Sequence, residues 1–178
     1  IITSVDSAMG YSFTVWSDST FRVSDSELHQ CGWSTLGWHT MGLYIFSDDA
    51  VIENSLISHN NFFGISGSRT RVIIRNNDIT ENKGSGIRLG SDMPGIDPAI
   101  YNNFISGNDG SGIDLFRISP SIYNNTITSN LRDGISMNNA SPKIFNNTIA
   151  LNLGTGIGCS DYSSPTIVNN TIASNLDK

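Results

Sequence analysis

Apolar residues in this chain occur singly or as pairs two positions apart, and they are separated by Asn, Gly, Ser and Pro. Ile113 and Leu115 flank Asp114, for example, whereas Ile122 and Ile127 each stand between polar residues. Such alternation is typical of β-strands, because successive side chains point to opposite faces of a sheet. β-branched residues dominate the apolar positions, and the frequent Gly and Asn disfavour helix. The pattern therefore predicts short strands along the whole chain.

This pattern repeats about every 22 residues, the period of a solenoid whose neighbouring repeats bury each other's apolar faces. Residues 121–137 read SIYNNTITSNLRDGISM, and residues 143–159 read KIFNNTIALNLGTGIGC. The second Asn of the NN pair, or its equivalent, advances in steps of 22, 26, 22, 22 and 23 through Ser55, Asn77, Asn103, Asn125, Asn147 and Asn170.

Each repeat has room for three short strands, which predicts an all-β fold with three parallel sheets. We expect a right-handed parallel β-helix, because crossovers between parallel strands are strongly right-handed. About seven rungs in a single domain, residues 1–178, account for the whole chain. The sequence stops at Lys178, where a Gly-Ile strand would follow, so we expect it to be a segment of a longer protein.

Polar columns should hold the corners between strands. Asn tolerates left-handed backbone angles, and its amide can bond the rungs above and below, so two Asn ladders are expected. The first would contain Asn76, Asn102, Asn124, Asn146 and Asn169, and the second Asn60, Asn82, Asn108, Asn130, Asn152 and Asn175. Burial in the first ladder would hide the glycosylation sequons at Asn124, Asn146 and Asn169.

Glycines form a further column, at Gly42, Gly64, Gly86, Gly112, Gly134 and Gly156. We expect them to permit a backbone conformation that is costly for other residues.

Composition restricts the partners. The net charge is −6, the pI is about 4.8 and no Lys/Arg cluster occurs, which argues against nucleic acid and anionic membranes as partners. No apolar run approaches the length of a transmembrane helix. The two cysteines, Cys31 and Cys159, fall about five rungs apart and are expected to be free. Few charges and abundant Asn, Ser and Thr favour an extracellular or cell-surface location, with the periplasm as the alternative. The oligomeric state stays open.

The repeat pattern SPxIxNNTIxxNxxxGI resembles that of the β-helix domains of the carbohydrate-binding and sugar-hydrolase group. This group includes pectate-lyase-like enzymes, alginate epimerases and lyases, and the NosD periplasmic copper-loading proteins. The resemblance covers residues 51–178 well and residues 13–42 loosely. It implies a polysaccharide partner bound on the outer face of one sheet. The Asp-Pro-His sequence of epimerases is missing, because Asp97-Pro98 is followed by Ala99, and this argues against epimerase activity.

Two insertions interrupt the period and flank one predicted sheet: WSTLGWHTM at residues 33–41 and GSDMPGIDP at residues 90–98. The outward column of that sheet is predicted to be Tyr44, Ser66, Arg88, Asp114, Ser136 and Gly158. Arg88 and Asp114, on adjacent rungs, are candidate catalytic residues, together with Arg117 and Asp133 in nearby loops. Carboxylates there could act as general acid and base. The alternative is a solvated cross-strand salt bridge between Arg88 and Asp114.

The loop aspartates Asp92, Asp97 and Asp109 are candidate ligands for Ca²⁺, which would hold a uronate carboxylate while Arg or Lys removes a proton. The histidines at positions 29, 39 and 59 are scattered, and without clustered Cys or Met they make a poor copper site.

Trp33, Trp38 and His39 in the first insertion, with Tyr44 behind them, are candidate substrate-binding residues. Aromatic faces stack on sugars because one face of a sugar ring presents apolar C–H groups. Alternatively, the tryptophans close the N-terminal end of the solenoid.

Three functions remain open. The first is a polysaccharide-active module of the lyase or hydrolase type, and the second is a non-catalytic glycan-binding module. The third is a structural or adhesin module.

Overall fold

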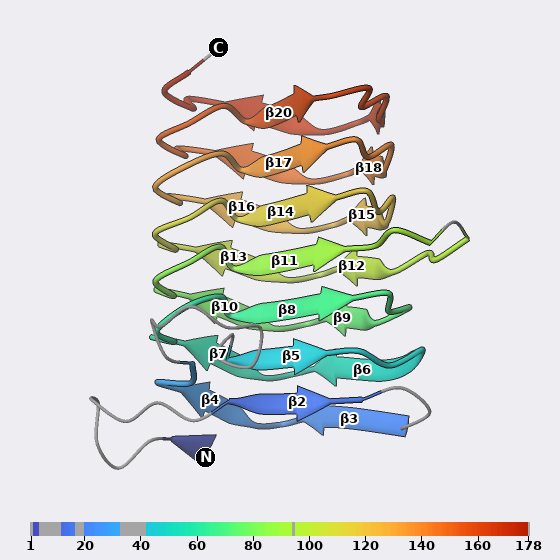
Figure 1. Cartoon of the computed structure of the whole chain (residues 1–178). Coiled ribbons are helices and arrows are strands. Elements are labelled where there is room, and N and C mark those ends of the chain that lie inside the picture. The colour runs from blue at the N-terminus through green and yellow to red at the C-terminus, as the bar shows by residue number, and fades with distance from the viewer. Residues whose placement is uncertain (1, 4–11, 17–19, 33–41, 94, 178) are drawn as a thin grey trace.

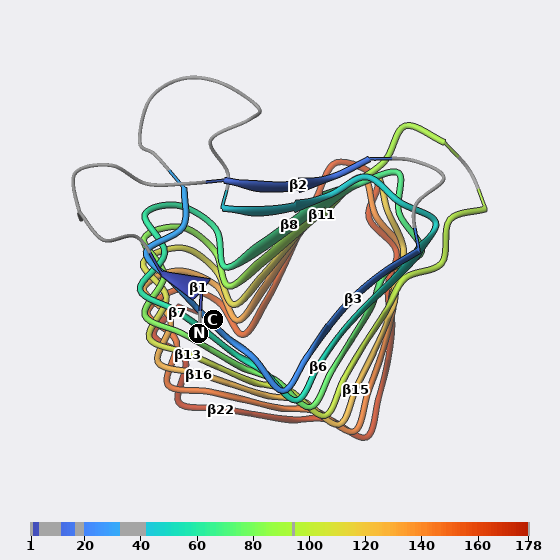
Figure 2. The same cartoon turned by 90° about the horizontal axis from the view of Figure 1, so that it is seen from below.

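The computed structural model describes residues 2–3, 12–16, 20–32, 42–93 and 95–177. In this part of the chain the backbone winds as a solenoid with three short strands in each turn and no helix. Figure 1 shows the turns stacked along one axis, and Figure 2 shows their three-sided outline from the end. The predicted all-β parallel solenoid with three sheets is therefore confirmed.

Three parallel sheets run along the solenoid, and each receives one strand from every turn. The first sheet contains, in spatial order, β1 (Ile2–Thr3), β4 (Glu27–His29), β7 (Leu56–Ser58), β10 (Asp78–Thr80), β13 (Phe104–Ser106), β16 (Thr126–Thr128), β19 (Thr148–Ala150) and β22 (Thr171–Ala173). The second contains β2 (Phe13–Val15), β5 (Leu43–Ile45), β8 (Ile65–Ser68), β11 (Ile87–Gly90), β14 (Ile113–Phe116), β17 (Ile135–Asn138) and β20 (Ile157–Ser160). The third contains β3 (Thr20–Ser24), β6 (Asp49–Glu53), β9 (Ile73–Arg75), β12 (Ala99–Tyr101), β15 (Ser121–Tyr123), β18 (Lys143–Phe145) and β21 (Thr166–Val168).

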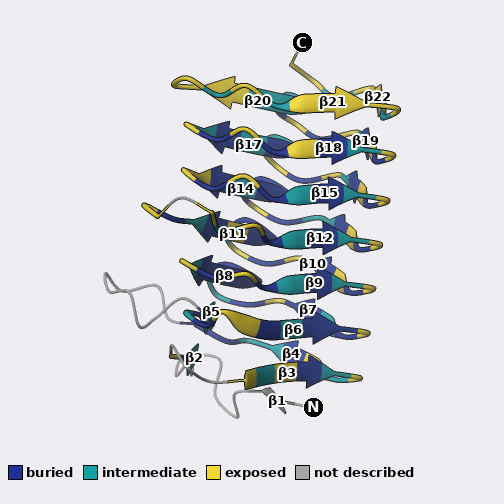
Figure 3. Cartoon of the chain, turned by 90° about the vertical axis from the view of Figure 1, so that its right-hand side faces the viewer, coloured by how far each residue is buried: buried dark blue, intermediate teal, exposed yellow. Residues whose placement is uncertain are grey.

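The core is a stack of aliphatic side chains, mostly isoleucine. Each strand in the middle of the stack turns one or two apolar residues inward, and these pair in register with the equivalent residues of the turns above and below. The fully buried isoleucines are Ile45, Ile52, Ile57, Ile65, Ile74, Ile79, Ile87, Ile100, Ile105, Ile113, Ile122, Ile127, Ile135, Ile144 and Ile149. Burial of each contributes about 1.5–3 kcal/mol. Figure 3 shows this buried interior, with the more exposed turn of β20, β21 and β22 at one end.

The hydrogen-bonded Asn ladder at the corner between the third and first sheets lies one residue later than predicted. Asn103 accepts bonds from the backbone and side-chain nitrogens of Asn77, both at 3.0 Å, and its Nδ2 donates to Asn125 at 3.0 Å and to a main-chain oxygen at 2.9 Å. This ladder is formed by the second Asn of each pair: Asn77, Asn103, Asn125, Asn147 and Asn170. The second predicted ladder is confirmed as Asn60, Asn82, Asn108, Asn130, Asn152 and Asn175.

The first Asn of each pair instead turns the corner, with φ between 49° and 56° at Asn54, Asn76, Asn102, Asn124, Asn146 and Asn169. Asp25 takes this place one turn earlier, with φ of 50°. Asn124, Asn146 and Asn169 are exposed. The prediction that burial hides these three sequons is therefore wrong, because the left-handed turn directs these side chains outward.

The glycine column is explained by lack of space. Among these glycines only Gly42 has a positive φ, of 76°. A Cβ on Gly112 would lie 2.4 Å from Cγ2 of Ile127 and 2.7 Å from the main-chain oxygen of Gly134. The prediction of a special backbone conformation is therefore wrong for the rest of the column, and it is the close approach of the next turn that requires Gly.

The outer face of the third sheet carries a row of interacting charged and aromatic side chains, and this row begins at a buried carboxylate. Glu53, with 4% of its side chain exposed, contacts Arg22 and binds Arg75 through Nε at 2.7 Å and Nη2 at 2.6 Å. Arg75 also donates to the hydroxyl of Tyr101 at 3.0 Å. Bonds to Tyr101 and Glu53, in that order, raise the pKa of Arg75. The rings of Tyr101 and Tyr123 then stack at 4.7 Å.

Candidate functional site

The outer face of the second sheet carries the column predicted from the sequence. Arg88 of β11 pairs with Ser66 of β8 on one side and with Asp114 of β14 on the other. Tyr44 and Ser136 extend the column in the same register. The alternation within each strand turns these residues outward, because their neighbours Ile87, Leu89, Ile113 and Leu115 are buried in the core.

Arg88 and Asp114 form a close ion pair across adjacent strands, as the structural alternative predicted. The side chains are 45% and 24% exposed, so the pair remains open to solvent. The guanidinium of Arg88 also lies 5.4 Å from the ring centroid of Phe63. Arg88 is therefore held from two sides at the centre of the sheet.

A polar groove runs beside this pair, along the corner that leads from the first sheet into the second. Its charged lining residues are Lys83, Arg88, Asp109, Asp114, Arg132 and Asp133. Lys83 lies 3.3 Å from Asp109, and Oδ1 of Asp133 accepts bonds from the backbone nitrogen and the hydroxyl of Thr155, both at 2.8 Å. Three of the four candidate catalytic residues, Arg88, Asp114 and Asp133, are thus brought together.

Glycines keep the wall of the groove low. A Cβ on Gly84 would lie 2.7 Å from the ring of Phe63, and one on Gly110 would lie 2.5 Å from the backbone nitrogen of Ser85. Adjacent turns therefore approach each other closely at these two glycines.

A second depression, here called the aromatic notch, lies on the same sheet beyond Arg88. It is lined by Tyr44, Ser66, Gly67, Ser68, Arg88, Gly90, Ser91, Asp92 and Phe116. Gly90 pairs with Ser68 below and with Phe116 above. Two adjacent strands thus carry small outward residues at the position where β14 carries an aromatic ring.

Arg117 lines neither depression, but it contacts two residues that line the notch, Phe116 and Asp92. Its guanidinium stands 4.8 Å from the ring centroid of Phe116, and its Nη1 donates to Asp92 at 3.0 Å. The structure therefore separates Arg117 from the other candidate catalytic residues and places it beside an aromatic wall.

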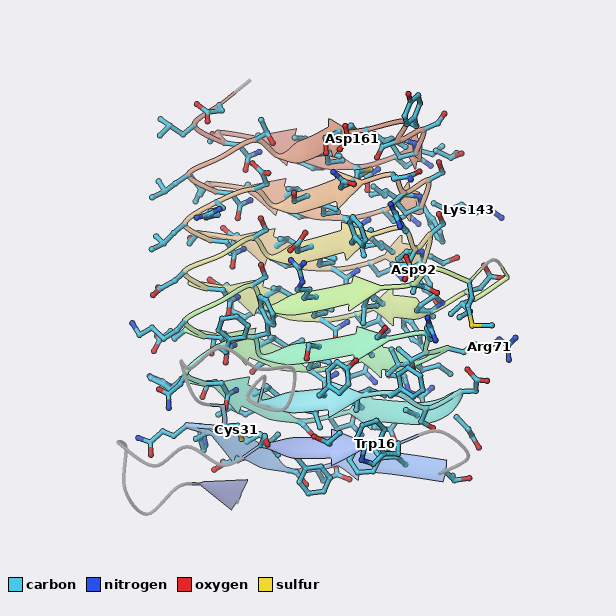
Figure 4. All side chains as sticks on the ribbon, viewed as in Figure 1. Trp16, Cys31, Arg71, Asp92, Lys143 and Asp161 are labelled. Carbon is cyan, nitrogen blue, oxygen red and sulfur yellow. The ribbon has the colours of Figure 1, made fainter. Side chains whose placement is uncertain are left out.

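The three candidate calcium ligands do not meet. Asp92 and the exposed Asp97 belong to the β11–β12 connection, which protrudes from the stack in Figure 1, and Figure 4 labels Asp92 at its base. Asp109 lies in the polar groove, paired with Lys83. Within the described ranges no group of three His, Cys, Asp or Glu side chains is placed to hold a metal ion. The described residues thus do not bring these three aspartates together, and calcium binding stays a prediction.

Trp33, Trp38 and His39 lie outside the described residues, so their predicted role in substrate binding is not examined by the structure. Tyr44, the fourth member of that set, lines the notch. Sequence reasoning missed Phe116, which is 39% exposed. Extending each predicted strand of the second sheet by one outward residue would have found it.

No disulfide joins Cys31, which is buried, to Cys159, which is exposed. Among the described residues, no helix has the length and apolarity needed to cross a membrane.

The sequence of residues 11–172 matches the family model described as "Right handed beta helix region". The chain belongs to this family. The handedness predicted from the crossover rule agrees with this assignment. No curated protein matches the sequence.

Among solved structures, this right-handed β-helix is similar to the A-module of mannuronan C-5 epimerase AlgE4 from Azotobacter vinelandii. The TM-score is 0.54 and the sequence identity 14%, over 95% of this chain and 55% of that one. The chain thus spans about half the length of the epimerase module. At this identity the likeness shows the fold alone.

Proposed function

We propose that this right-handed β-helix is a polysaccharide-active module of the lyase or hydrolase type, with its substrate bound along the polar groove. The observation that carries the proposal is the gathering of three cations and three carboxylates in one groove along the corner between the first and second sheets. The similarity to the A-module of a mannuronan C-5 epimerase supports a polysaccharide as the partner.

Asp114 and Asp133 are the carboxylates proposed for proton transfer. A hydrolase needs one carboxyl group as acid and the other as base or nucleophile. A lyase needs a base beside a cation that neutralises the uronate, and Arg88 and Arg132 supply positive charge in the same groove. Both reactions would use side chains on rigid turns of the solenoid.

The test is a screen against acidic and neutral polysaccharides, with and without Ca²⁺, that follows unsaturated-product absorbance and new reducing ends. We expect one of the two signals from the wild type and its loss in Asp114→Asn. Asp78→Asn is the matched control, because Asp78 is an exposed carboxylate on β10 of the first sheet. An Asp114→Asn variant with full turnover and unchanged circular dichroism would contradict the catalytic role.

A non-catalytic glycan-binding module is the second candidate. It is favoured by the engagement of both carboxylates, since Asp114 is paired with Arg88 and Asp133 accepts two bonds from Thr155. Binding without turnover in the same screen would select this function. Silence in both binding and turnover would favour a structural or adhesin module.

We also propose an extracellular or cell-surface location. The acidic pI of about 4.8 and the small share of charged residues, 15%, support it. Fractionation of the source cells with an antibody against the chain tests this, and recovery in the cytosol would refute it.

A further inference from the structure

The aromatic notch is built by a local change in side-chain size. Phe116 on β14 stands in register with Gly90 on β11 and Ser68 on β8, and these two residues are small. Tyr44 on β5 lines the same depression one outward position earlier along its strand, in register with Ser66. Three strand steps and an offset of two residues along the strand separate the main chains of Tyr44 and Phe116 by roughly 16 Å. This distance leaves room for one pyranose ring over the two small residues.

The Phe116 wall is fixed before any ligand arrives. The guanidinium of Arg117 lies 4.8 Å from the ring centroid and is itself held by Asp92 at 3.0 Å, while Phe116 as a residue remains 39% exposed. A preorganised aromatic ring costs little conformational entropy on binding. Asp92 and Arg88 add an acceptor and donors on the polar side of the notch.

The notch is continuous with the polar groove, because Arg88 lines both. We infer that the notch is a separate sugar-binding subsite, which takes one pyranose residue of the polysaccharide beyond the unit held at Asp114 and Asp133. The inference rests on the proposed function, since a polysaccharide lying in the groove continues past Arg88 into the notch.

The chemistry of the lining defines the occupant. The C–H face of a pyranose packs on Phe116 or Tyr44, and its hydroxyls bond to Arg88 and Asp92 at the rim. Stacking on an aromatic ring does not require a charged sugar, so the notch selects the shape of the pyranose ring. The polar groove, in contrast, selects charged groups of the substrate.

Gly90 allows the notch to be filled without strain. A Cβ there would meet nothing closer than the main-chain oxygen of Phe116 at 3.4 Å, and its φ is not positive. Gly90→Leu therefore blocks the notch, and Phe116→Ala removes one wall. Phe104→Ala is the matched control, because Phe104 is 43% exposed on β13 of the first sheet.

The experiment is calorimetric titration of the whole chain with two probes, a mannuronan hexasaccharide and cellohexaose. We expect Gly90→Leu and Phe116→Ala each to weaken hexasaccharide binding about tenfold, the scale of one lost ring contact. Phe104→Ala should bind like the wild type. Thermal melts of every variant verify the fold.

The two proposals fail in different ways. If the wild type binds a probe, Arg88→Met and Asp114→Asn weaken it, and both notch variants bind as the wild type does, the subsite is refuted and the groove stands. If the wild type binds neither probe, the proposed function is overturned for these two polysaccharides. The subsite, which rests on that function, is then overturned as well.

Discussion

At the scale of single residues, the NN pair of each turn divides two tasks between adjacent side chains. Asn124 has a φ of 55° and is exposed, whereas Asn125 is buried and bonded to the turns on both sides. The left-handed residue, Asn124, changes the direction of the chain. The side-chain amide of the next residue, Asn125, then donates hydrogen bonds to main-chain oxygens at the corner. Identical residues thus differ in role because their backbone angles differ.

Replacing these two asparagines by Ala should therefore have unequal effects. Asn125→Ala removes bonds to Asn103 and Asn147 and to the main-chain oxygen of Ile100 in the interior, with an expected loss of about 3 kcal/mol in the free energy of unfolding. Asn124→Ala keeps the ladder and should lose about 1 kcal/mol through its left-handed angle. Urea denaturation monitored by circular dichroism measures both, and equal losses would contradict this division.

At the scale of elements, the outer faces of the second and third sheets differ in regularity. The third sheet repeats one ring type on three turns, with Tyr123 stacked on Tyr101 at 4.7 Å and on Phe145 at 4.9 Å. The second sheet changes its outward residue at nearly every turn, and this variation creates the groove and the notch. Repetition therefore stabilises the rod, and departure from repetition forms the candidate site.

The stacked rings predict a pH effect on Tyr123. Burial raises its pKa above the ordinary value near 10, and the Coulombic effect of Tyr101 adds to this. Because the folded state holds the proton more tightly, the contribution to stability is fully present below about pH 10 and is lost as the pH rises through the folded-state pKa. Absorbance at the tyrosinate band should show one residue that titrates late.

Tyr123→Phe identifies that residue. A Phe already occupies the next place in the column at Phe145, so the variant should fold normally. It should lose the late-titrating signal and show a weaker decline of melting temperature above pH 10. If the titration curve of Tyr123→Phe differs from that of the wild type in amplitude but not in shape, Tyr123 ionises like an exposed tyrosine and the prediction is wrong.

At the scale of the whole molecule, stability depends on position along the stack. Every interior strand is bonded on both edges, whereas β20, β21 and β22 each end a sheet. Ile167 and Ile172 on these strands are 45% and 47% exposed, although their counterparts Ile144 and Ile149 one turn below are fully buried. Local opening free energies follow such differences in burial and pairing.

Hydrogen exchange should therefore form a gradient along the rod. We expect amides of β21 and β22 to exchange at least ten times faster than those of β15 and β16, because the interior strands open only with the turns around them. Exchange followed by mass spectrometry of proteolytic peptides gives the rates. Uniform protection across the four strands would mean that the chain unfolds only as one unit.

The fold and the main ion pair could be predicted because the repeat fixes the register. Once Ile87 and Ile113 are assigned to the core, Arg88 and Asp114 must face outward side by side. Phe116 was missed because the predicted strands were one outward residue too short, and the position of Asp92 could not be predicted because the path of an inserted loop has no period. The roles of the Asn pair were shifted by one residue, since both positions carry the same amino acid.

The sequence by itself determined the period, the three-sheet solenoid, the core columns and the outward residues of the second sheet. It did so because each apolar side chain must stack on its equivalent one turn away, and this fixes register wherever the interior is buried. Only the tertiary structure decided that Arg117 contacts the ring of Phe116 while it binds Asp92, and that Arg88 lines both the groove and the notch. Those contacts depend on side-chain size and loop path on the solvent face, where no packing requirement repeats from turn to turn.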